Sequence, residues 1–294
     1  MHAEKSVLIV DDDSDIHSLL HAALGPKGLN VESACDGLDA LRRLRNKPFD
    51  LILLDILMPD MDGLALLPKV HEIRPDIKVV VMTAANTPGN LIASIREQAF
   101  SYFSKPFSTD AVVDTVLRAL EATVDKDDIE VMSARPEWIS LEVRCRLETA
   151  DRLAQFFRAL NMGLSAEQQE QVITAFRELL MNAIEHGCHW DPAKKVHLTY
   201  IRTPRAVIYY IRDPGEGFSM ENLPHAAVSN RPEAPIEHAE VRNEMGMRPG
   251  GFGILLSRQL VDDVIYNEKG NEVLLIKYLN GGTPPNISSG ADLF

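Results

Sequence analysis

Short apolar runs alternate with amphipathic stretches through the first 124 residues of the chain. Three runs are strong, Val7–Val10, Leu51–Leu54 and Val79–Met82, and weaker ones lie near Val31 and at Tyr102–Phe103. Strands with nearly continuous apolar sequence are typical of parallel sheets that helices cover on both faces. The pattern therefore predicts five β–α units in a doubly wound, flavodoxin-like α/β domain with a five-stranded parallel sheet.

The intervening stretches carry helical periodicity. Between the first two apolar runs, Ile16, Leu19, Leu20, Ala23 and Leu24 recur at the spacing of one helical face. Gly25-Pro26 ends this pattern, as expected at a helix C-terminus. The last helix of the domain is predicted to begin after Ser108, a good N-cap residue.

The second half of the chain has a different pattern. The charged, aperiodic stretch before Trp138 predicts a linker over residues 125–136, between a first domain over 1–124 and a second over 137–280. The second domain is predicted to hold a strand at 138–145, helices at 148–161 and 165–187, strands at 196–201 and 206–212, a loop-rich stretch 214–250, a helix at 252–263 and two last strands. This order predicts an α/β sandwich, with helices on one face of a mostly antiparallel sheet. The Gly/Pro/Ser-rich tail, 281–294, is expected to be disordered.

Composition and charge narrow the class of protein. The 294-residue chain has a net charge of −13, of which residues 1–124 carry −6 (12 basic against 18 acidic residues) and the rest −7 (18 against 25). So acidic a surface argues against direct DNA binding. Cys35, Cys145 and Cys188 form no CxxC pair, which argues against a disulfide framework and predicts a reducing, cytoplasmic setting. No apolar run is long enough to span a membrane.

Polar residues follow the predicted strands of the first domain. Asp11 and Asp12 follow the first strand, Asp55 the third, Thr83 ends the fourth and Lys105 the fifth. The carboxyl ends of parallel strands share one edge of the sheet, where ligands bind. Clustered carboxylates repel one another unless a cation joins them, and oxygen ligands suit Mg²⁺. We therefore expect a magnesium-assisted phosphoryl site.

Four segments of the first domain resemble the response-regulator receiver family: LIVDDD, LLDILMPDMDG, VVMTA and YFSKPF. The resemblance implies that Asp55 is the phospho-acceptor and that Asp11, Asp12, Asp55 and the backbone carbonyl of Leu57 form the metal site. It further implies that Thr83 and Lys105 bind the phosphoryl group, that Tyr102 is an aromatic switch residue, and that a sensor histidine kinase is the phosphodonor.

Three motifs mark the second domain, although the Lys-bearing phosphate loop GxxxxGK[ST] is absent. In FRELLMNAIEHG, Glu178 and Asn182 lie on one helical face. RDPGEGF places Asp213 before two glycines, and RPGGFGILLSRQLVD places glycines before a helix, whose first N–H groups favour phosphate. His186, Cys188 and His189 lack a second ligand cluster at zinc spacing, so a zinc site is not expected.

These motifs resemble the Bergerat-fold ATPases, and most closely the anti-sigma-factor serine kinases. The resemblance implies ATP and Mg²⁺, with Asn182 holding the metal, Asp213 receiving the adenine amino group, Gly215 and Gly217 shaping the adenine pocket, and Gly251 and Gly253 at the phosphates. It also implies a lid over 219–250, whose Arg231, Arg242 and Arg248 could reach phosphate, and it makes Glu178 a candidate general base.

Three interpretations of the fusion remain open. The first is a serine/threonine kinase, gated by Asp55 phosphorylation, that acts on an anti-anti-sigma (STAS-type) protein or a sigma factor. The second is a nucleotide-binding module that sequesters a partner without transferring phosphate. The third is a histidine-kinase-like domain that acts in trans, because no histidine lies between His71 and His186 to accept phosphate in cis. A homodimer is expected in each case.

Overall fold

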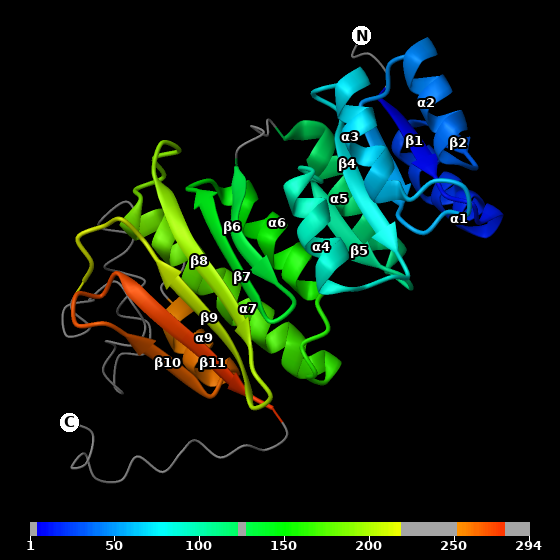
Figure 1. The fold of residues 1–294 in the computed structure, drawn as a ribbon. Coiled ribbons are helices and arrows are strands. Elements are labelled where there is room, and N and C mark those ends of the chain that lie inside the picture. Colours follow the sequence, from blue (N-terminus) through cyan, green and yellow to red (C-terminus); the bar gives the residue numbers. More distant parts are fainter. Residues whose placement is uncertain (1–4, 123–127, 219–251, 280–294) are drawn as a thin grey trace. The chain divides into compact units, whose positions relative to one another are not determined.

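The structure is a computed structural model that describes residues 5–122, 128–218 and 252–279. The chain forms two compact units (Figure 1). One comprises residues 1–131 with 155–161, and the other 132–154 with 162–294. No helix among the described residues combines the length and apolar character that crossing a membrane requires.

The first unit is built on a five-stranded sheet in the order β2-β1-β3-β4-β5. Every neighbouring pair in this sheet is parallel, as the sequence predicts. β3 is buried along its whole length, as expected for a strand covered on both faces. The strands are β1 Ser6–Val10, β2 Asn30–Ala34, β3 Leu51–Asp55, β4 Lys78–Thr83 and β5 Ser101–Ser104.

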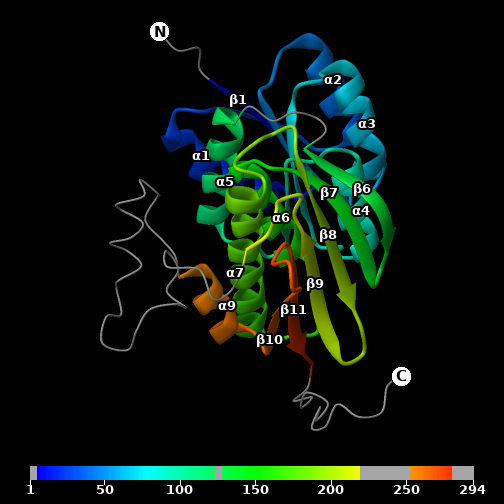
Figure 2. The ribbon, with the colours of Figure 1, turned by 90° about the vertical axis from the view of Figure 1, so that its left-hand side faces the viewer.

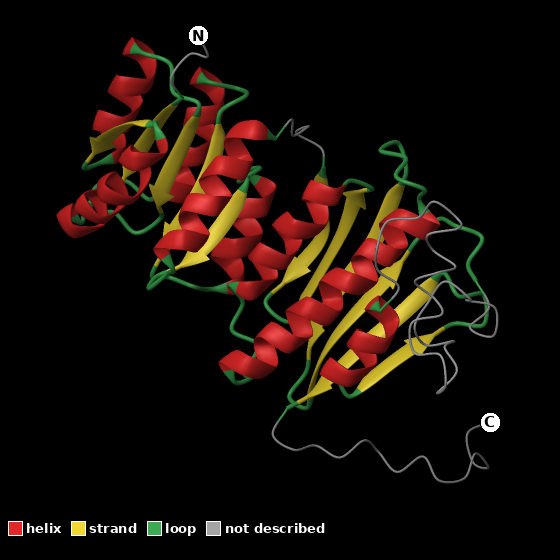
Figure 3. Cartoon of the chain, turned by 180° about the vertical axis from the view of Figure 1, so that it is seen from behind, coloured by secondary structure: helices red, strands yellow, loops and turns green. Residues whose placement is uncertain are grey.

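Five α-helices cover the two faces of this sheet (Figure 3). Leu20 and Leu24 of the first helix pack with Val112 and Val116 of the last into one core cluster, which includes residues of β1, β3 and β4. The Ser108 side chain accepts a hydrogen bond from Ala111 N–H, which confirms the predicted cap. The helices are α1 Ser14–Leu24, α2 Gly37–Asn46, α3 Gly63–Ile73, α4 Pro88–Arg96 and α5 Thr109–Glu121.

The second unit is built on a six-stranded sheet in the order β10-β11-β9-β8-β7-β6. The pairings β7–β8, β8–β9, β9–β11 and β10–β11 are antiparallel. The sequence predicts a linker over 125–136, but the structure has strand β6 there. β6 is an edge strand and most of its residues are at least partly exposed, so its sequence lacks the apolar run of a central strand. The strands are β6 Ile129–Arg135, β7 Trp138–Arg144, β8 Lys195–Arg202, β9 Ala206–Arg212, β10 Asp263–Tyr266 and β11 Glu272–Tyr278.

The helices of the second unit lie on one face of its sheet, which confirms the predicted sandwich (Figure 2). The longest, α7 (Ala166–Asn182), begins with a capping box in which Ser165 and Gln168 exchange side-chain and backbone hydrogen bonds. A π-helical turn, Ala183–Gly187, continues it. The other helices are α6 Leu147–Arg158 and α9 Gly253–Leu260.

The structure contains a disulfide, although the cysteine spacing argues against a disulfide framework. Cys145 and Cys188 are bonded, although 43 residues separate them in the sequence. Both are buried, whereas Cys35 is free and exposed. Sequence spacing did not reveal the pair because the two cysteines come together only when α7 packs against the sheet.

The capping box of α7 supports a prediction about stability. Ser165→Ala removes the hydroxyl that accepts the Gln168 N–H, so the free energy of unfolding should fall by about 1 kcal/mol. Urea unfolding monitored by circular dichroism measures this change. Thr174→Ala, which removes an exposed hydroxyl from the middle of the same helix, is the matched control and should cost nothing. Equal losses for both variants would contradict a capping role.

Candidate functional site

An acidic cluster lies at the carboxyl edge of the first sheet. Asp11 follows β1, and Asp55 is the last residue of β3, the strand beside it. Asp11 is fully buried and Asp55 is 4% exposed. Carboxylate oxygens of Asp11, Asp12 and Asp55 all lie within 4.8 Å of one another, the one group of potential metal ligands found among the described residues. The parallel sheet thus brings together the three carboxylates that the sequence predicts.

Lys105 balances part of this negative charge. Its Nζ lies 2.7 Å from Asp11 Oδ2 and 2.6 Å from Asp55 Oδ2. Burial raises the pKa of Asp11 against the opposing effect of Lys105. Burial tends to lower the pKa of Lys105, but its bonds to Asp11 and Asp55 outweigh this and leave that pKa raised. The lysine is therefore a fixed cation between two carboxylates.

The remaining predicted residues of the first unit lie around this cluster. Thr83 is buried at the end of β4, and its hydroxyl oxygen accepts a hydrogen bond from Ala85 N–H. The Leu57 N–H donates to Asp55 Oδ1, while the Leu57 side chain is 53% exposed. Tyr102 is buried on β5, its hydroxyl donates to the Ala85 carbonyl, and burial raises its pKa. The residues around the cluster therefore include the Thr83 hydroxyl and the backbone at Leu57.

A cavity of about 890 Å³ opens in the second unit. Glu178 and Asn182 of α7 both line it, as does Gly253, the first residue of α9. A Cβ placed on Gly253 would lie 3.0 Å from Glu178 Oε2 and 3.5 Å from Asn182 Nδ2. The two polar residues predicted on one helical face thus meet the predicted helix start. The volume is that of pockets that hold small ligands.

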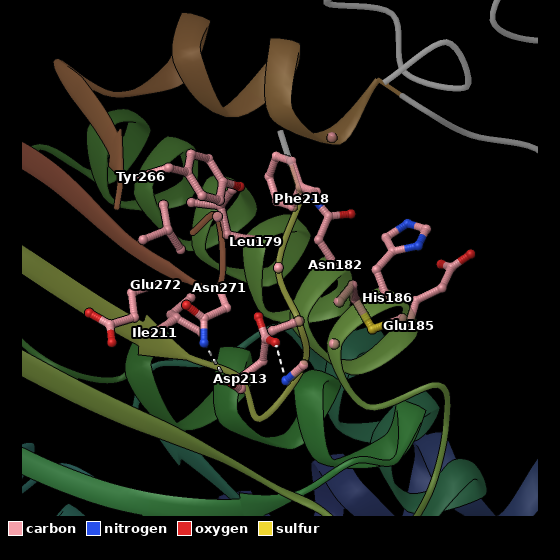
Figure 4. A pocket seen from close by; sticks show the side chains of 18 of the residues that line it. Leu179, Asn182, Glu185, His186, Ile211, Asp213, Phe218, Tyr266, Asn271 and Glu272 are labelled. Atoms are coloured by element: carbon pink, nitrogen blue, oxygen red, sulfur yellow. Dashed lines mark hydrogen bonds between the residues drawn. The ribbon is translucent and has the colours of Figure 1, made fainter. Parts of the chain in front are cut away.

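Asp213 lies on the wall of this cavity, just after β9 (Figure 4). Its Oδ1 accepts a hydrogen bond from Gly215 N–H at 2.8 Å, and its backbone N–H and carbonyl both bond to Asn271. Burial raises the pKa of Asp213. A Cβ on Gly187 would overlap its carboxyl group, so only glycine permits this approach of the π-helical turn.

The glycines of the second motif have a steric role in the cavity. Gly215 and Gly217 both line it, and Gly217 has a φ of 81°, a conformation that favours glycine. The lid segment 219–250, with Arg231, Arg242 and Arg248, lies outside the described residues, and so does Gly251.

Several cavity residues were not predicted from the sequence. Phe218 and Tyr266 form an edge-on ring pair with centroids 5.1 Å apart. Asn271 forms hydrogen bonds with both backbone groups of Asp213. Asn271 lies beside Asp213 because β9 pairs with β11, and Tyr266 reaches the cavity because β10 pairs with β11. No local motif could have revealed them.

Arg177 is a further residue that sequence reasoning missed. Its Nε donates to Asp151 Oδ1 at 2.7 Å, and its Nη1 lies 3.4 Å from Glu178 Oε1. Arg177 lines the cavity with Glu178. The cavity therefore contains a cation beside the carboxylate that is expected to act as a base.

The Lys105 contacts support a prediction about the acidic cluster. Lys105→Met leaves the buried Asp11 carboxylate without its cation, so in a chelating buffer the free energy of unfolding should fall by about 1–3 kcal/mol. Millimolar Mg²⁺ should restore part of this loss. Urea unfolding with and without the chelator measures both effects, and exposed Lys69→Met is the control. A Lys105→Met protein as stable as the unmodified chain would refute the charge argument.

Comparisons with known proteins divide the chain at the same place as the two motif sets. The response regulator receiver domain model matches residues 7–117. The histidine kinase-like ATPase domain model matches residues 143–277.

Similar proteins are found for the first part of the chain. It is 37% identical over 117 residues to the transcriptional regulatory protein ZraR of Salmonella typhimurium, covering 40% of this chain and 26% of that protein. It is 40% identical over 114 residues to the DNA-binding transcriptional regulator NtrC of Escherichia coli, covering 39% of this chain and 24% of that one. The matches thus span about a quarter of the length of these relatives.

A solved structure matches the same part. The CheY-like receiver domain protein from Methanospirillum hungatei is 33% identical, with a TM-score of 0.40, and the match covers 40% of this chain and 95% of that one. The two family models agree with the division of the chain into a parallel and a mostly antiparallel sheet. The chain joins a response regulator receiver domain, residues 7–117, to a histidine kinase-like ATPase domain, residues 143–277.

Proposed function

We propose that the receiver domain accepts a phosphoryl group on Asp55 from a sensor histidine kinase, and that this controls the output of an ATP-binding domain. The receiver match and the position of Asp55 beside Asp11 and Lys105 support the first part. The ATPase match and the cavity that contains Glu178 and Asn182 support the second. We expect the protein to act in the cytoplasm as a homodimer.

In the receiver, an Asp55 carboxylate oxygen attacks the phosphorus of a phosphohistidine. The P–N bond breaks, the imidazole nitrogen leaves with the electron pair, and an aspartyl phosphate forms. Lys105 and the Thr83 hydroxyl would bind the transferred oxygens, and Tyr102 would respond as the switch residue. Asp11, Asp12, Asp55 and the Leu57 carbonyl would hold Mg²⁺, and their oxygen-only donor set fits that ion. When bound, Mg²⁺ supplies positive charge that offsets repulsion between carboxylates and phosphate.

In the ATPase domain, the cavity would hold ATP. Asp213 would accept the adenine amino group beside Gly215 and Gly217, against the apolar wall of Phe218 and Tyr266. Asn182 would hold Mg²⁺ on the phosphates. The phosphates themselves would lie at Gly251 and Gly253, where the first N–H groups of α9 favour negative charge.

We propose that the output is a protein serine/threonine kinase that acts on an anti-anti-sigma (STAS-type) protein or a sigma factor. The observation that carries this proposal is the meeting of Glu178, Asn182 and the start of α9 at one place. Glu178 would take the proton of the attacking hydroxyl while Asn182 and Gly253 hold the phosphates. The chemistry would depend mainly on positioning and charge neutralisation.

A catalytically silent nucleotide-binding module is the second candidate, and the Arg177–Glu178 ion pair favours it. The Arg177 guanidinium contacts Glu178 Oε1, one of the two oxygens that could take the proton of an attacking hydroxyl. A histidine-kinase-like activity in trans is a third candidate. The three candidates differ in whether a partner is labelled and in the chemical stability of the label.

Glu178 and Asn182 support a prediction about transfer. Glu178→Gln should retain ATP but lose at least about a hundredfold of the transfer rate to a STAS-type partner, because general base catalysis contributes that much. Asn182→Ala should lose Mg²⁺-dependent ATP binding. Titration calorimetry measures binding, and labelled ATP measures transfer.

The form of the label and the Arg177 variant separate the three candidates. An acid-stable label on the partner supports a serine/threonine kinase, whereas an acid-labile label reveals transfer to histidine. No transfer by the unmodified protein, together with intact ATP binding, refutes the kinase proposal in favour of the silent module. Arg177→Ala tests the restraint on Glu178, since its removal should raise the transfer rate if the ion pair limits the base.

The raised pKa of Asp213 supports a prediction about pH. Either oxygen of the ionised Asp213 carboxylate can accept a hydrogen bond from the adenine amino group, whereas protonation turns one of them into a donor. ATP affinity should therefore fall as the pH drops through the pKa of Asp213. Because burial raises that pKa, the loss should begin at a higher pH than for an exposed aspartate. Calorimetry over a pH series measures it, and Asp213→Asn reports the dependence due to ATP itself. Parallel pH profiles for the two proteins would contradict the assignment.

A further inference from the structure

The segment Ala183–Trp190 has an unusual backbone. α7 continues into a π-helical turn at Ala183–Gly187, a rare form that often occurs at functional sites. His189 and Trp190 then follow with φ values of 56° and 59°. Bulky residues in this left-handed region are strained and persist only where the surrounding structure holds them. Some constraint must therefore hold this segment in place.

The Cys145–Cys188 disulfide provides a constraint of this kind. Cys188 directly follows the π-helical turn, and Cys145 directly follows β7. Hydrogen bonds reinforce the link, from Cys145 N–H to the Lys194 carbonyl at 3.3 Å and from Trp190 N–H to the Ile184 carbonyl at 3.2 Å. The disulfide thus ties the end of α7 to the sheet at the point where the strained residues begin.

The same segment forms one wall of the proposed nucleotide cavity. Glu185, His186, Gly187 and His189 all line it, and Figure 4 shows Glu185 and His186 beside Asn182. Gly187 lies so close to Asp213 that a Cβ would overlap the carboxyl group. A Cβ on Gly215 would lie 2.8 Å from Gly187 Cα. A shift of Gly187, next to Cys188, would therefore displace the residues expected to bind adenine.

We propose that Cys145 and Cys188 are a redox modification site that sets the nucleotide affinity of the cavity. The disulfide holds Ala183–Trp190 in the conformation that forms the wall, and the dithiol form allows the two left-handed residues to relax. This inference rests on the proposed binding of ATP. It adds an input to the ATPase domain that is separate from phosphorylation of Asp55.

The chemistry of the modification balances with a hydroperoxide as oxidant. One cysteine thiolate attacks an oxygen of hydrogen peroxide, and the O–O bond breaks. The sulfur becomes a sulfenic acid, and the released hydroxide takes up the proton of the thiol to form water. The second thiol displaces hydroxide from that sulfur, which gives the disulfide and a second water. Two thiols thus lose two electrons and two protons. A dithiol or phosphine reductant returns the pair to thiols. Because both cysteines are buried, each reaction requires a local opening of the segment.

The test uses the full chain with Cys35→Ser, which removes the exposed free thiol. Calorimetry measures the Kd for Mg-ATP after oxidation with hydrogen peroxide and after reduction with a phosphine, and a thiol titration confirms each state. The oxidised protein should bind ATP at least about tenfold more tightly, within the usual range of coupling between sites. Cys145→Ser/Cys188→Ser should match the reduced protein in both conditions and should not respond to peroxide.

A second measurement reports the segment itself. The chain has two tryptophans, so in a Trp138→Phe background Trp190 is the single tryptophan and can be excited selectively over the six tyrosines. Its emission should shift on reduction and shift back on reoxidation. Ser165→Ala is the stability control, because it weakens α7 without touching the disulfide. If it weakens ATP binding as much as reduction does, general destabilisation explains the effect and the proposal fails.

The outcomes separate this inference from the proposed function. Equal ATP affinity in both confirmed redox states overturns the redox inference and leaves ATP binding intact. No ATP binding in either state overturns the proposed function of the cavity, and with it this inference. A tenfold difference that the double serine variant abolishes supports both.

Discussion

Charge repulsion among buried carboxylates is the constraint around which the receiver site is organised. The carboxyl ends of the parallel strands lie at one edge of the sheet. Asp11 and Asp55 meet there because β1 and β3 are neighbouring strands. Lys105 offsets part of their charge from the end of β5 and lies within hydrogen-bonding distance of both. One lysine cannot neutralise three carboxylates. The site therefore retains an affinity for further positive charge, which is what a magnesium-assisted phosphoryl site requires.

In the described part of the nucleotide cavity, the charge of the Asp213 carboxylate is not balanced by a close cation as in the receiver site. No close cation pairs with the Asp213 carboxylate among the described residues; backbone hydrogen bonds and the neighbouring Lys269 only partly offset its burial. Close packing fixes its position instead, with Gly187 on one side and Asn271 on the other. A carboxylate held by packing depends on the backbone conformation of its neighbours. The geometry of the π-helical turn therefore matters more to this site than any single ion pair.

The sequence predicted what local patterns determine. The parallel strands, the cap at Ser108 and β9, which matches its predicted range, follow from apolar periodicity and turn residues. β6 was missed because an edge strand needs no continuous apolar run. Asn271, Tyr266 and Arg177 were missed because their role depends on strand pairing and on side-chain direction. The disulfide was missed because cysteine spacing carries no information about which distant residues the fold brings together.

These two kinds of site suggest how one chain could receive two signals. A phosphoryl group on Asp55 would change the charge balance around Lys105, and such a change can alter the output only if it favours one conformation of the ATPase domain over another. Oxidation of Cys145 and Cys188 would act on the backbone of the cavity wall directly. If both inputs bias the same segment, Ala183–Trp190, their effects on ATP affinity should be coupled and not simply additive. If phosphorylation acts elsewhere, the two free energies should add, because independent sites do not interact.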